Sequence, residues 1–83
     1  MTEPVDPGII ECFHTALGRP DLVLDGASTM ESTEGWDSFA HINLVLALED
    51  RFSVEFESDE IPELNEMSRI VEALRARGAI DPS

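Results

Sequence analysis

The chain has 83 residues, which is enough for one small domain with a modest hydrophobic core. It carries 18 acidic residues against 5 arginines and no lysine, and this net charge of −13 argues against nucleic acid and anionic membrane surfaces as partners. A single cysteine excludes an internal disulfide and a thiolate metal site, and without a signal peptide or a membrane-spanning run we expect a soluble, cytoplasmic protein.

The first predicted element is a helix that begins after Asp6 and ends at Gly18. Asp6 is a good N-cap, and Pro7 suits the first helical position because its missing N–H would have no partner there. Four apolar residues then recur at helical spacing: Ile9, Ile10, Phe13 and Leu17. Cys12 lies near this stripe and is expected to be a small buried residue, whereas His14 is expected to face solvent.

Residues 18–35 are predicted to form a long loop. Their sequence, GRPDLVLDGASTMESTEG, is rich in turn-forming residues and has no sustained period. A loop of this length needs packing of its own to stay ordered, so we expect Leu22, Leu24 and Met30 to contact the core. Trp36, which follows the loop, is expected to pack it against the helices.

The central predicted helix begins at Ser38, with Asp37 or Ser38 as its N-cap. Its apolar residues cover more than half of a helical wheel: Phe39, Ile42, Val45, Leu46, Leu48 and Phe52. The remaining narrow strip consists of Ala40, Asn43, Ala47, Asp50 and Arg51. Such broad apolar coverage indicates a helix at the centre of the fold.

The remaining elements are shorter. Residues 53–57, SVEFE, alternate like a strand but have no second strand to pair with, so we expect an extended connector with Val54 and Phe56 pointing inward. Ser58 then caps a short helix, and a final helix carries an apolar stripe at Met67, Ile70, Val71 and Leu74 before it stops at Gly78.

The predicted fold is therefore all-α, a bundle of three main helices and one short helix with a long first loop. It forms a single domain of residues 1–83, with about residues 5–78 folded and flexible termini.

Two sets of residues raise the question of catalysis or metal binding. Ser38 with His41 or His14 and an acid would form a hydrolase triad, but nothing in so short a chain indicates an oxyanion hole or a pocket. The acids of the connector and short helix are oxygen ligands of the kind Ca²⁺ prefers: Glu55, Glu57, Asp59, Glu60 and Glu63. They lack the spacing and glycine of an EF-hand, so we expect a solvated acidic surface, no metal site and no catalysis by the chain alone.

The segment DSFAHINLVLALEDRF, residues 37–52, resembles the DSL motif and second helix of the acyl carrier proteins, the phosphopantetheine-bearing family that includes peptidyl and D-alanyl carriers. The resemblance covers nearly the whole chain and implies an acyl-carrier-like bundle. It implies that Ser38 receives 4′-phosphopantetheine from coenzyme A through a phosphopantetheinyl transferase, with Asp37 presenting the serine. The arm would carry an acyl or aminoacyl thioester between loading ligases and downstream synthases or transferases. The carrier itself would catalyse nothing, and a monomer suits such a shuttle.

The same resemblance points to residues that bind partners. Phe39 stands where the family usually has leucine, an apolar position that partners contact. The acids expected to meet basic partner surfaces are Glu34, Glu49, Asp50, Glu57, Asp59 and Glu60. Carriers of fatty-acid synthesis have acids in the first turns of this helix, where the present chain has Ala40, His41 and Asn43. This difference favours a dedicated secondary-metabolite pathway, polyketide or nonribosomal peptide, or another specialised acyl pathway.

Two alternatives belong to other functional classes. The first is an unmodified acidic helical adaptor that docks a protein partner through its acidic face and the apolar residues near Phe39. It predicts partner binding that is indifferent to Ser38→Ala. The second is a small serine hydrolase, which predicts ester turnover that is lost with His41→Ala.

Overall fold

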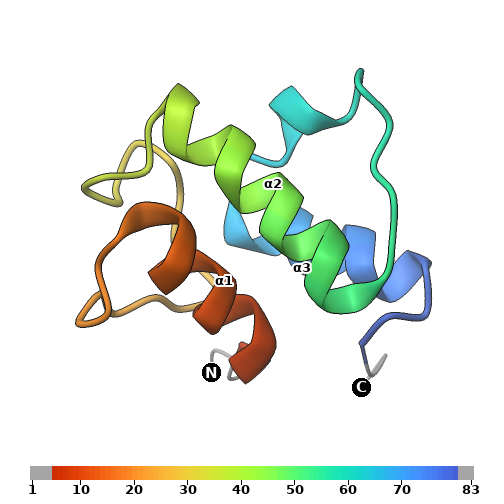
Figure 1. Ribbon diagram of the computed structural model, residues 1–83, viewed down its shortest axis with the longest axis horizontal. Coiled ribbons are helices and arrows are strands. Elements are labelled where there is room, and N and C mark those ends of the chain that lie inside the picture. Colours follow the sequence, from red (N-terminus) through yellow and green to blue (C-terminus); the bar gives the residue numbers. More distant parts are fainter. Residues whose placement is uncertain (1–4, 81–83) are drawn as a thin grey trace.

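The computed structural model describes residues 5–80, which fold into three α-helices and one short 3₁₀ helix with no strand (Figure 1). The elements are α1 (Pro7–Leu17), α2 (Ser38–Phe52), the 3₁₀ helix η1 (Ile61–Glu63) and α3 (Met67–Ala76). The predicted all-α fold, with three main helices and a short one, is confirmed. The prediction of flexible termini falls partly on residues 1–4 and 81–83, which lie outside the described residues.

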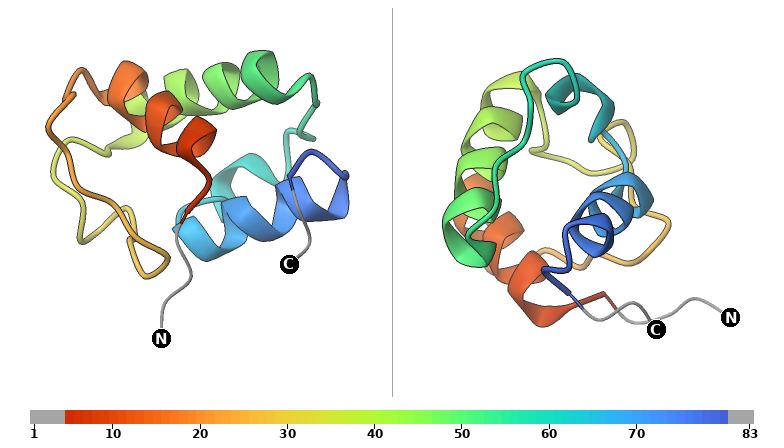
Figure 2. Two further views of the ribbon diagram at one scale, coloured as in Figure 1. Left: turned by 90° about the horizontal axis from the view of Figure 1, so that it is seen from below. Right: turned by 90° about the vertical axis from the view of Figure 1, so that its right-hand side faces the viewer.

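The core lies between a layer formed by α1 and α2 and a second layer formed by α3 (Figure 2). The largest fully buried side chains come from all three helices: Ile9, Phe13, Leu44, Leu48, Met67, Ile70 and Leu74. Cys12 is buried in the same cluster, as predicted, and this burial raises the pKa of its thiol. The core is thus apolar and shared by the three helices.

Local signals set the limits of α1. The Asp6 carboxylate accepts a hydrogen bond from the Gly8 N–H at 2.8 Å, and Gly18, with a φ of 66°, ends the helix in the left-handed conformation. Gly8 also marks a close approach, because a Cβ atom there would lie 3.0 Å from Phe52 Cζ of α2. A larger residue at position 8 would therefore require the side chains of Phe52 and of the capping residue Asp6 to shift.

The long loop is anchored to the core at several points. Leu24 and Met30 pack against the core, as predicted, whereas Leu22 is half-buried and does not belong to the residues packed against it. Trp36 is 2% exposed, and its ring meets that of Phe13 in a T-shaped arrangement with 4.8 Å between the centroids. The prediction that Trp36 fastens the loop to the helices is confirmed.

The middle of the loop is also joined to the start of α3. Met30 N–H donates to the Asn65 carbonyl at 2.9 Å, and Met67 N–H donates to the Ser28 carbonyl at 2.8 Å, which makes a short antiparallel pairing. We call this pairing the loop–α3 bridge. The residue at the N-cap position of α3 makes no side-chain capping bond, so the loop supplies an acceptor for one of the N–H groups that a helix start leaves unpaired.

The burial pattern of α2 differs from the prediction. Ala40, which the sequence pattern placed on the narrow strip, is buried, and so is His41. Three large apolar side chains that the pattern grouped with the core are exposed: Phe39 (79%), Ile42 (53%) and Leu46 (58%). A helix that is apolar around most of its circumference can turn several faces inward, and here hydrogen bonds to Trp36 and η1 select the face with His41.

The connector between α2 and η1 is extended and turns its apolar side chains inward, as predicted. Two carboxylates hold its main chain: Phe56 N–H donates to Glu49 at 2.9 Å, and Glu57 N–H donates to Glu60 at 2.9 Å. Ser58 does not cap the short helix, so that prediction is wrong. The side chain of Glu60 closes the preceding turn instead.

Two further expectations are wrong. His14 is half-buried and does not face solvent, because its Nε2 atom lies 2.8 Å from the Leu22 carbonyl oxygen and holds the first part of the loop. The chain also does not fray directly after Gly78. Ala79 and Ile80 pack against the core, so the folded part extends at least to the last described residue.

Candidate functional site

The start of α2 presents Ser38 at the surface. Ser38 is the first residue of the helix and is exposed, and no described residue makes a hydrogen bond with its hydroxyl. Asp37 is the N-cap, and its carboxylate accepts the Ala40 N–H at 2.8 Å. Because Asp37 supplies the cap, the Ser38 oxygen is left accessible for chemistry.

The electrostatic setting of this end of α2 suits an anionic group. The N–H groups of the first turn and the helix dipole favour negative charge at the N-terminus of a helix of 15 residues. The first turn itself contains no acidic side chain, and the carboxylate next to Ser38 is that of the N-cap Asp37, which is engaged by the Ala40 N–H. A phosphodiester attached to Ser38 would therefore be tolerated there.

His41 is fully engaged behind the Ser38 surface and is only 5% exposed. Its Nδ1 atom lies 3.0 Å from Trp36 Nε1, and its Nε2 atom lies 2.7 Å from the Ile61 carbonyl oxygen of η1. With both ring nitrogens bonded elsewhere, His41 is not placed as a base for Ser38, and His14 is held by the loop. The hydrolase triad weighed from the sequence is therefore not formed.

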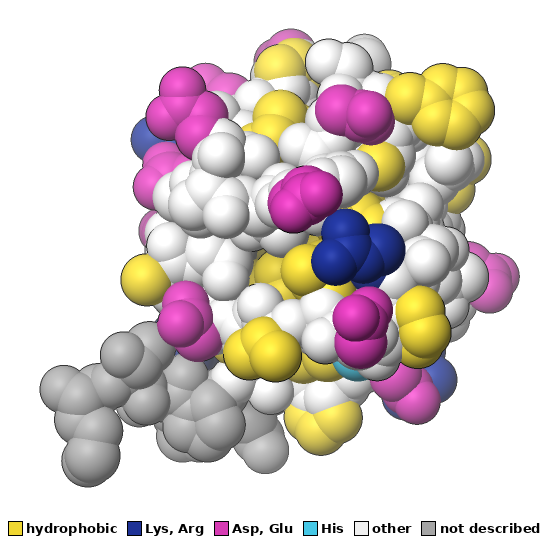
Figure 3. All heavy atoms as spheres, turned by 90° about the vertical axis from the view of Figure 1, so that its left-hand side faces the viewer, with side chains coloured by type: hydrophobic (Ala, Val, Ile, Leu, Met, Phe, Trp, Pro, Cys, Tyr) yellow, Lys and Arg dark blue, Asp and Glu magenta, His cyan; other side chains and the backbone are white. Residues whose placement is uncertain are grey.

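An apolar surface runs along α2 next to Ser38. It consists of Phe39, Ile42 and Leu46, and we call it the apolar α2 surface. Large apolar side chains exposed together on one helix are unusual on a protein that stays alone in solution, and they typify sites that contact partners. On the face of the molecule that bears the long loop, exposed hydrophobic side chains lie among acidic ones (Figure 3).

The acids predicted to meet partners fall into two groups. Four are exposed: Glu34, Asp50, Glu57 and Asp59. The other two serve the fold with their carboxylates, since Glu49 accepts the Phe56 N–H and Glu60 pairs with Arg77. Arg77 also lies over the Phe56 ring, 4.8 Å from its centroid, and so fastens the connector to the end of α3.

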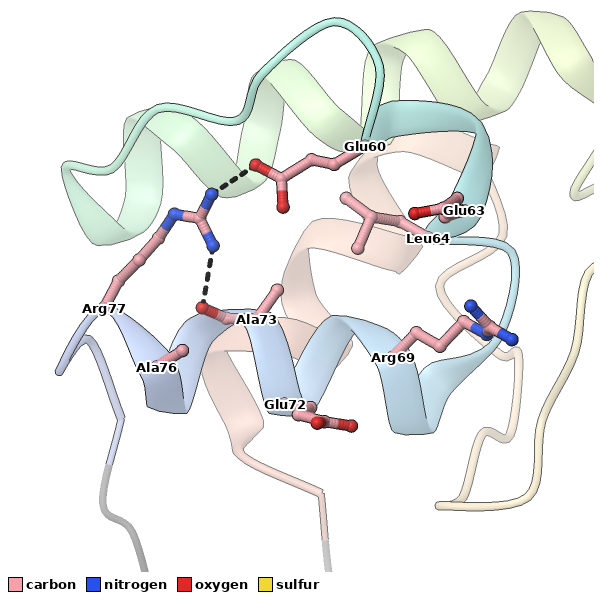
Figure 4. Close-up of a pocket in the computed structure, with 8 residues that line it drawn as sticks. All are labelled: Glu60, Glu63, Leu64, Arg69, Glu72, Ala73, Ala76 and Arg77. Carbon is pink, nitrogen blue, oxygen red and sulfur yellow. Dashed lines mark hydrogen bonds and ion pairs between the residues drawn. The ribbon is translucent and has the colours of Figure 1, made fainter.

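A groove of about 330 Å³ lies between η1 and α3 (Figure 4). Its lining residues are Glu60, Glu63, Leu64, Arg69, Glu72, Ala73, Ala76 and Arg77, none of which belongs to α2. The two arginines of its rim are already held, Arg77 by Glu60 and Arg69 by Glu66. The groove is thus separate from the residues around Ser38 and offers no free cation to an anionic ligand.

The sequence predicts a role for Ser38 and Asp37 at the start of α2, whereas it indicates His41 only as a possible triad base and does not predict its bonds to Trp36 and η1. The available signal was its place among the apolar residues of α2, five positions after the single tryptophan.

Among residues 5–80, no three His, Cys, Asp or Glu side chains are grouped so that they could hold a metal ion. Within the same range, no helix has the length and apolar character needed to cross a membrane.

Comparison with known protein families identifies the family of this chain. The family model described as "Phosphopantetheine attachment site" matches residues 7–74, which run from the start of α1 to the last turns of α3. No curated protein matches the chain significantly.

Proposed function

The chain belongs to the phosphopantetheine attachment site family, and we propose that Ser38 is the residue to which its 4′-phosphopantetheine is attached. Domains of this family are the site of covalent attachment of that group. The observation that supports Ser38 is its position, an exposed hydroxyl in the first turn of α2 that is relieved of capping by Asp37.

In the attachment reaction the carrier supplies only the serine hydroxyl. The Ser38 oxygen forms a bond to the phosphorus of the pantetheine phosphate, and the pyrophosphate bond of coenzyme A breaks to release adenosine 3′,5′-bisphosphate. The hydroxyl proton passes to the transferase that catalyses the step. The product is a phosphodiester anion, which the N-terminal end of α2 favours electrostatically. Ser38 therefore needs exposure and orientation, and the carrier needs no base of its own.

Intact mass spectrometry after incubation with coenzyme A and a broad-specificity transferase tests the assignment. We expect one pantetheine adduct on the wild type and none on Ser38→Ala. Ser68→Ala is the matched control, since Ser68 is also an exposed serine in the first turn of a helix, α3, and this variant should keep the adduct. An adduct on Ser38→Ala, or none on the wild type, would refute the proposal.

We further propose a non-catalytic, monomeric, cytoplasmic carrier of an acyl or aminoacyl thioester, working in a specialised pathway such as polyketide or nonribosomal peptide synthesis. The support comes from α2, which has no acid in its first turn and exposes Phe39, Ile42 and Leu46 where a partner would approach Ser38. A partner that fits this surface has an apolar groove with basic groups at its rim, facing Glu34 and Asp50.

Salt dependence tests this pathway assignment. Docking through the apolar α2 surface predicts that loading of the pantetheine-bearing form by a ligase of a specialised pathway weakens only slightly as salt rises, because apolar contacts are not screened. Efficient use by enzymes of fatty-acid synthesis, with a steep loss at high salt, would contradict the assignment. Asp50→Asn, which removes one exposed charge, should change the association rate more than the dissociation rate.

The adaptor alternative retains one observation in its favour, because the apolar α2 surface and the exposed acids could bind a partner without any modification. It is separated from the carrier by Ser38→Ala. An adaptor binds its partner equally with or without the hydroxyl, whereas a carrier loses its cargo-dependent partners.

A further inference from the structure

We propose that His41 is a positioning residue for the modification of Ser38: its imidazole, held in the neutral Nε2–H form, joins the segment before Ser38 to η1 and fixes how the serine is presented. This inference rests on the proposed attachment at Ser38. It assigns a role to a buried polar side chain that the attachment chemistry itself does not use.

The polarity of the two hydrogen bonds follows from the chemistry of the partners. The indole N–H of Trp36 can only donate, so the Nδ1 atom of His41, 3.0 Å away, must be an unprotonated acceptor. The Ile61 carbonyl can only accept, so the Nε2 atom of His41, 2.7 Å away, must carry the proton and donate it. Only the neutral Nε2–H tautomer satisfies both partners, and a doubly protonated ring would lose the bond to Trp36.

These bonds act at the junction that carries Ser38. Trp36 is two residues before Ser38 and directly precedes the capping residue Asp37. The indole ring is fixed on one side by Phe13 of α1 and on another by His41, whose ring meets it edge to edge with 6.0 Å between the centroids and 29° between the ring planes. The main chain closes the same junction, since His41 N–H donates to the Asp37 carbonyl at 2.8 Å. A single residue thus ties the cap, the loop end and η1 together.

The chain contains one other histidine, and it provides a matched control. The Nε2 atom of His14 lies 2.8 Å from the Leu22 carbonyl oxygen, so it makes the same kind of bond to the long loop, far along the chain from Ser38. A general loss of loop anchoring should affect His14 and His41 variants alike. A positioning role predicts that only variants of the Trp36–His41 pair slow the modification of Ser38.

The kinetic experiment measures kcat/KM for transfer from coenzyme A to the wild type, Trp36→Phe, His41→Gln, His41→Leu and His14→Ala. It is run at a temperature at which far-ultraviolet circular dichroism shows each variant fully folded. Trp36→Phe keeps a ring against Phe13 but removes the indole donor, and we expect it to lower kcat/KM about fivefold or more. His41→Gln, whose amide can still meet one partner, should retain more activity than His41→Leu, and His14→Ala should match the wild type.

The spectroscopic experiment reads the tautomer directly. With two histidines in the chain, the ring ¹⁵N signals of His41 can be assigned by comparison with His14→Ala. We expect an unprotonated Nδ1 and a protonated Nε2 in the wild type, and loss of this fixed polarity in Trp36→Phe. A protonated Nδ1 in the wild type would overturn the hydrogen-bond assignment.

The remaining outcomes separate the two proposals. Wild-type transfer rates in Trp36→Phe and His41→Leu, with the adduct still on Ser38, would overturn the positioning role and leave the attachment site intact. An equal loss in His14→Ala would reduce His41 to a general structural residue and overturn the role as well. A wild type that takes no adduct would overturn the attachment proposal and this inference with it.

Discussion

Two faces of the same helix, α2, carry large apolar side chains, and one face is buried while the other is exposed. The inner face buries Leu44, Val45 and Leu48 against α1 and α3, whereas the apolar α2 surface leaves Phe39, Ile42 and Leu46 in contact with solvent. Residue type alone does not distinguish these faces. The difference lies in what covers them, and it teaches that the fold buries one apolar face of the helix and leaves the other in solvent.

The largest expected effect comes from truncating one leucine on each face. Leu48→Ala removes a fully buried side chain and should lower the free energy of unfolding by about 2–5 kcal/mol through lost transfer energy and a residual cavity. Leu46→Ala, only two positions away, should change it by about 0.5 kcal/mol or less. Urea unfolding followed by the fluorescence of Trp36 measures both. Equal losses would mean that both faces are buried in solution.

The next effect concerns binding by the outer face. Phe39→Ala should leave stability nearly unchanged but weaken the interaction with the transferase or a loading enzyme about tenfold, as expected when an aromatic anchor is removed from an interface. The measurement is KM for transfer, or Kd by calorimetry, alongside a thermal melt. A large fall in Tm with an unchanged KM would show that Phe39 serves the fold and would erase the contrast between the faces.

Asp37 is the N-cap of α2, the helix that carries both faces. Asp37→Ala removes the hydrogen bond to Ala40 N–H and should destabilise the protein by about 1 kcal/mol. Asp37→Asn keeps a capping oxygen and should recover most of that loss. Thermal unfolding of the two variants checks the prediction, and equal destabilisation by both would argue that charge, and not capping, is the contribution of Asp37.

The smallest effect tests whether water is excluded from the core that the inner face of α2 covers, and it uses Cys12 of α1, which belongs to the same core cluster. Burial raises the pKa of the Cys12 thiol above its ordinary value of 9.0, so the folded state holds its proton more tightly than the unfolded state. The stability contribution is therefore present below that value and is lost as the pH rises through the pKa of the folded state. The free energy of unfolding is measured for the wild type and for Cys12→Ala at about pH 8 and at about pH 10.5. The amount by which the wild type exceeds the variant should be smaller at the higher pH. A pH-independent difference would indicate a thiol that water reaches.

Short-range signals in the sequence account for most of the helix limits. Asp6 with Pro7, Gly18, Asp37 and Gly78 mark helix ends through contacts or dihedral preferences that involve neighbouring residues only. The place of Ser38 at a helix start could be predicted for the same reason, since its motif is local, and its role as the attachment site stays a proposal. The family resemblance drawn from residues 37–52 agrees with the match over residues 7–74.

What the sequence did not predict depends on partners far along the chain. The phase of α2 is set partly by the bond between His41 and the Ile61 carbonyl, and no local pattern indicates that a carbonyl twenty positions later will be in reach. Glu49 and Glu60 were predicted to be free surface acids. Their carboxylates bind main-chain N–H groups of the connector, and Glu60 also pairs with Arg77, and only the folded chain brings these groups within reach. Polar side chains near a core thus need the tertiary structure before a role can be given to them.

The loop–α3 bridge has a consequence for how the molecule opens. Met30 and Met67 each donate a main-chain hydrogen bond across it, so neither amide can exchange its hydrogen with solvent unless the loop and the first turn of α3 separate. The two amides should therefore exchange at matching rates, as members of one cooperative opening unit that spans segments distant in sequence. A protease that cuts the middle of the loop would release the first turn of α3 as well, which makes proteolysis of the loop a direct measure of how often that helix undocks.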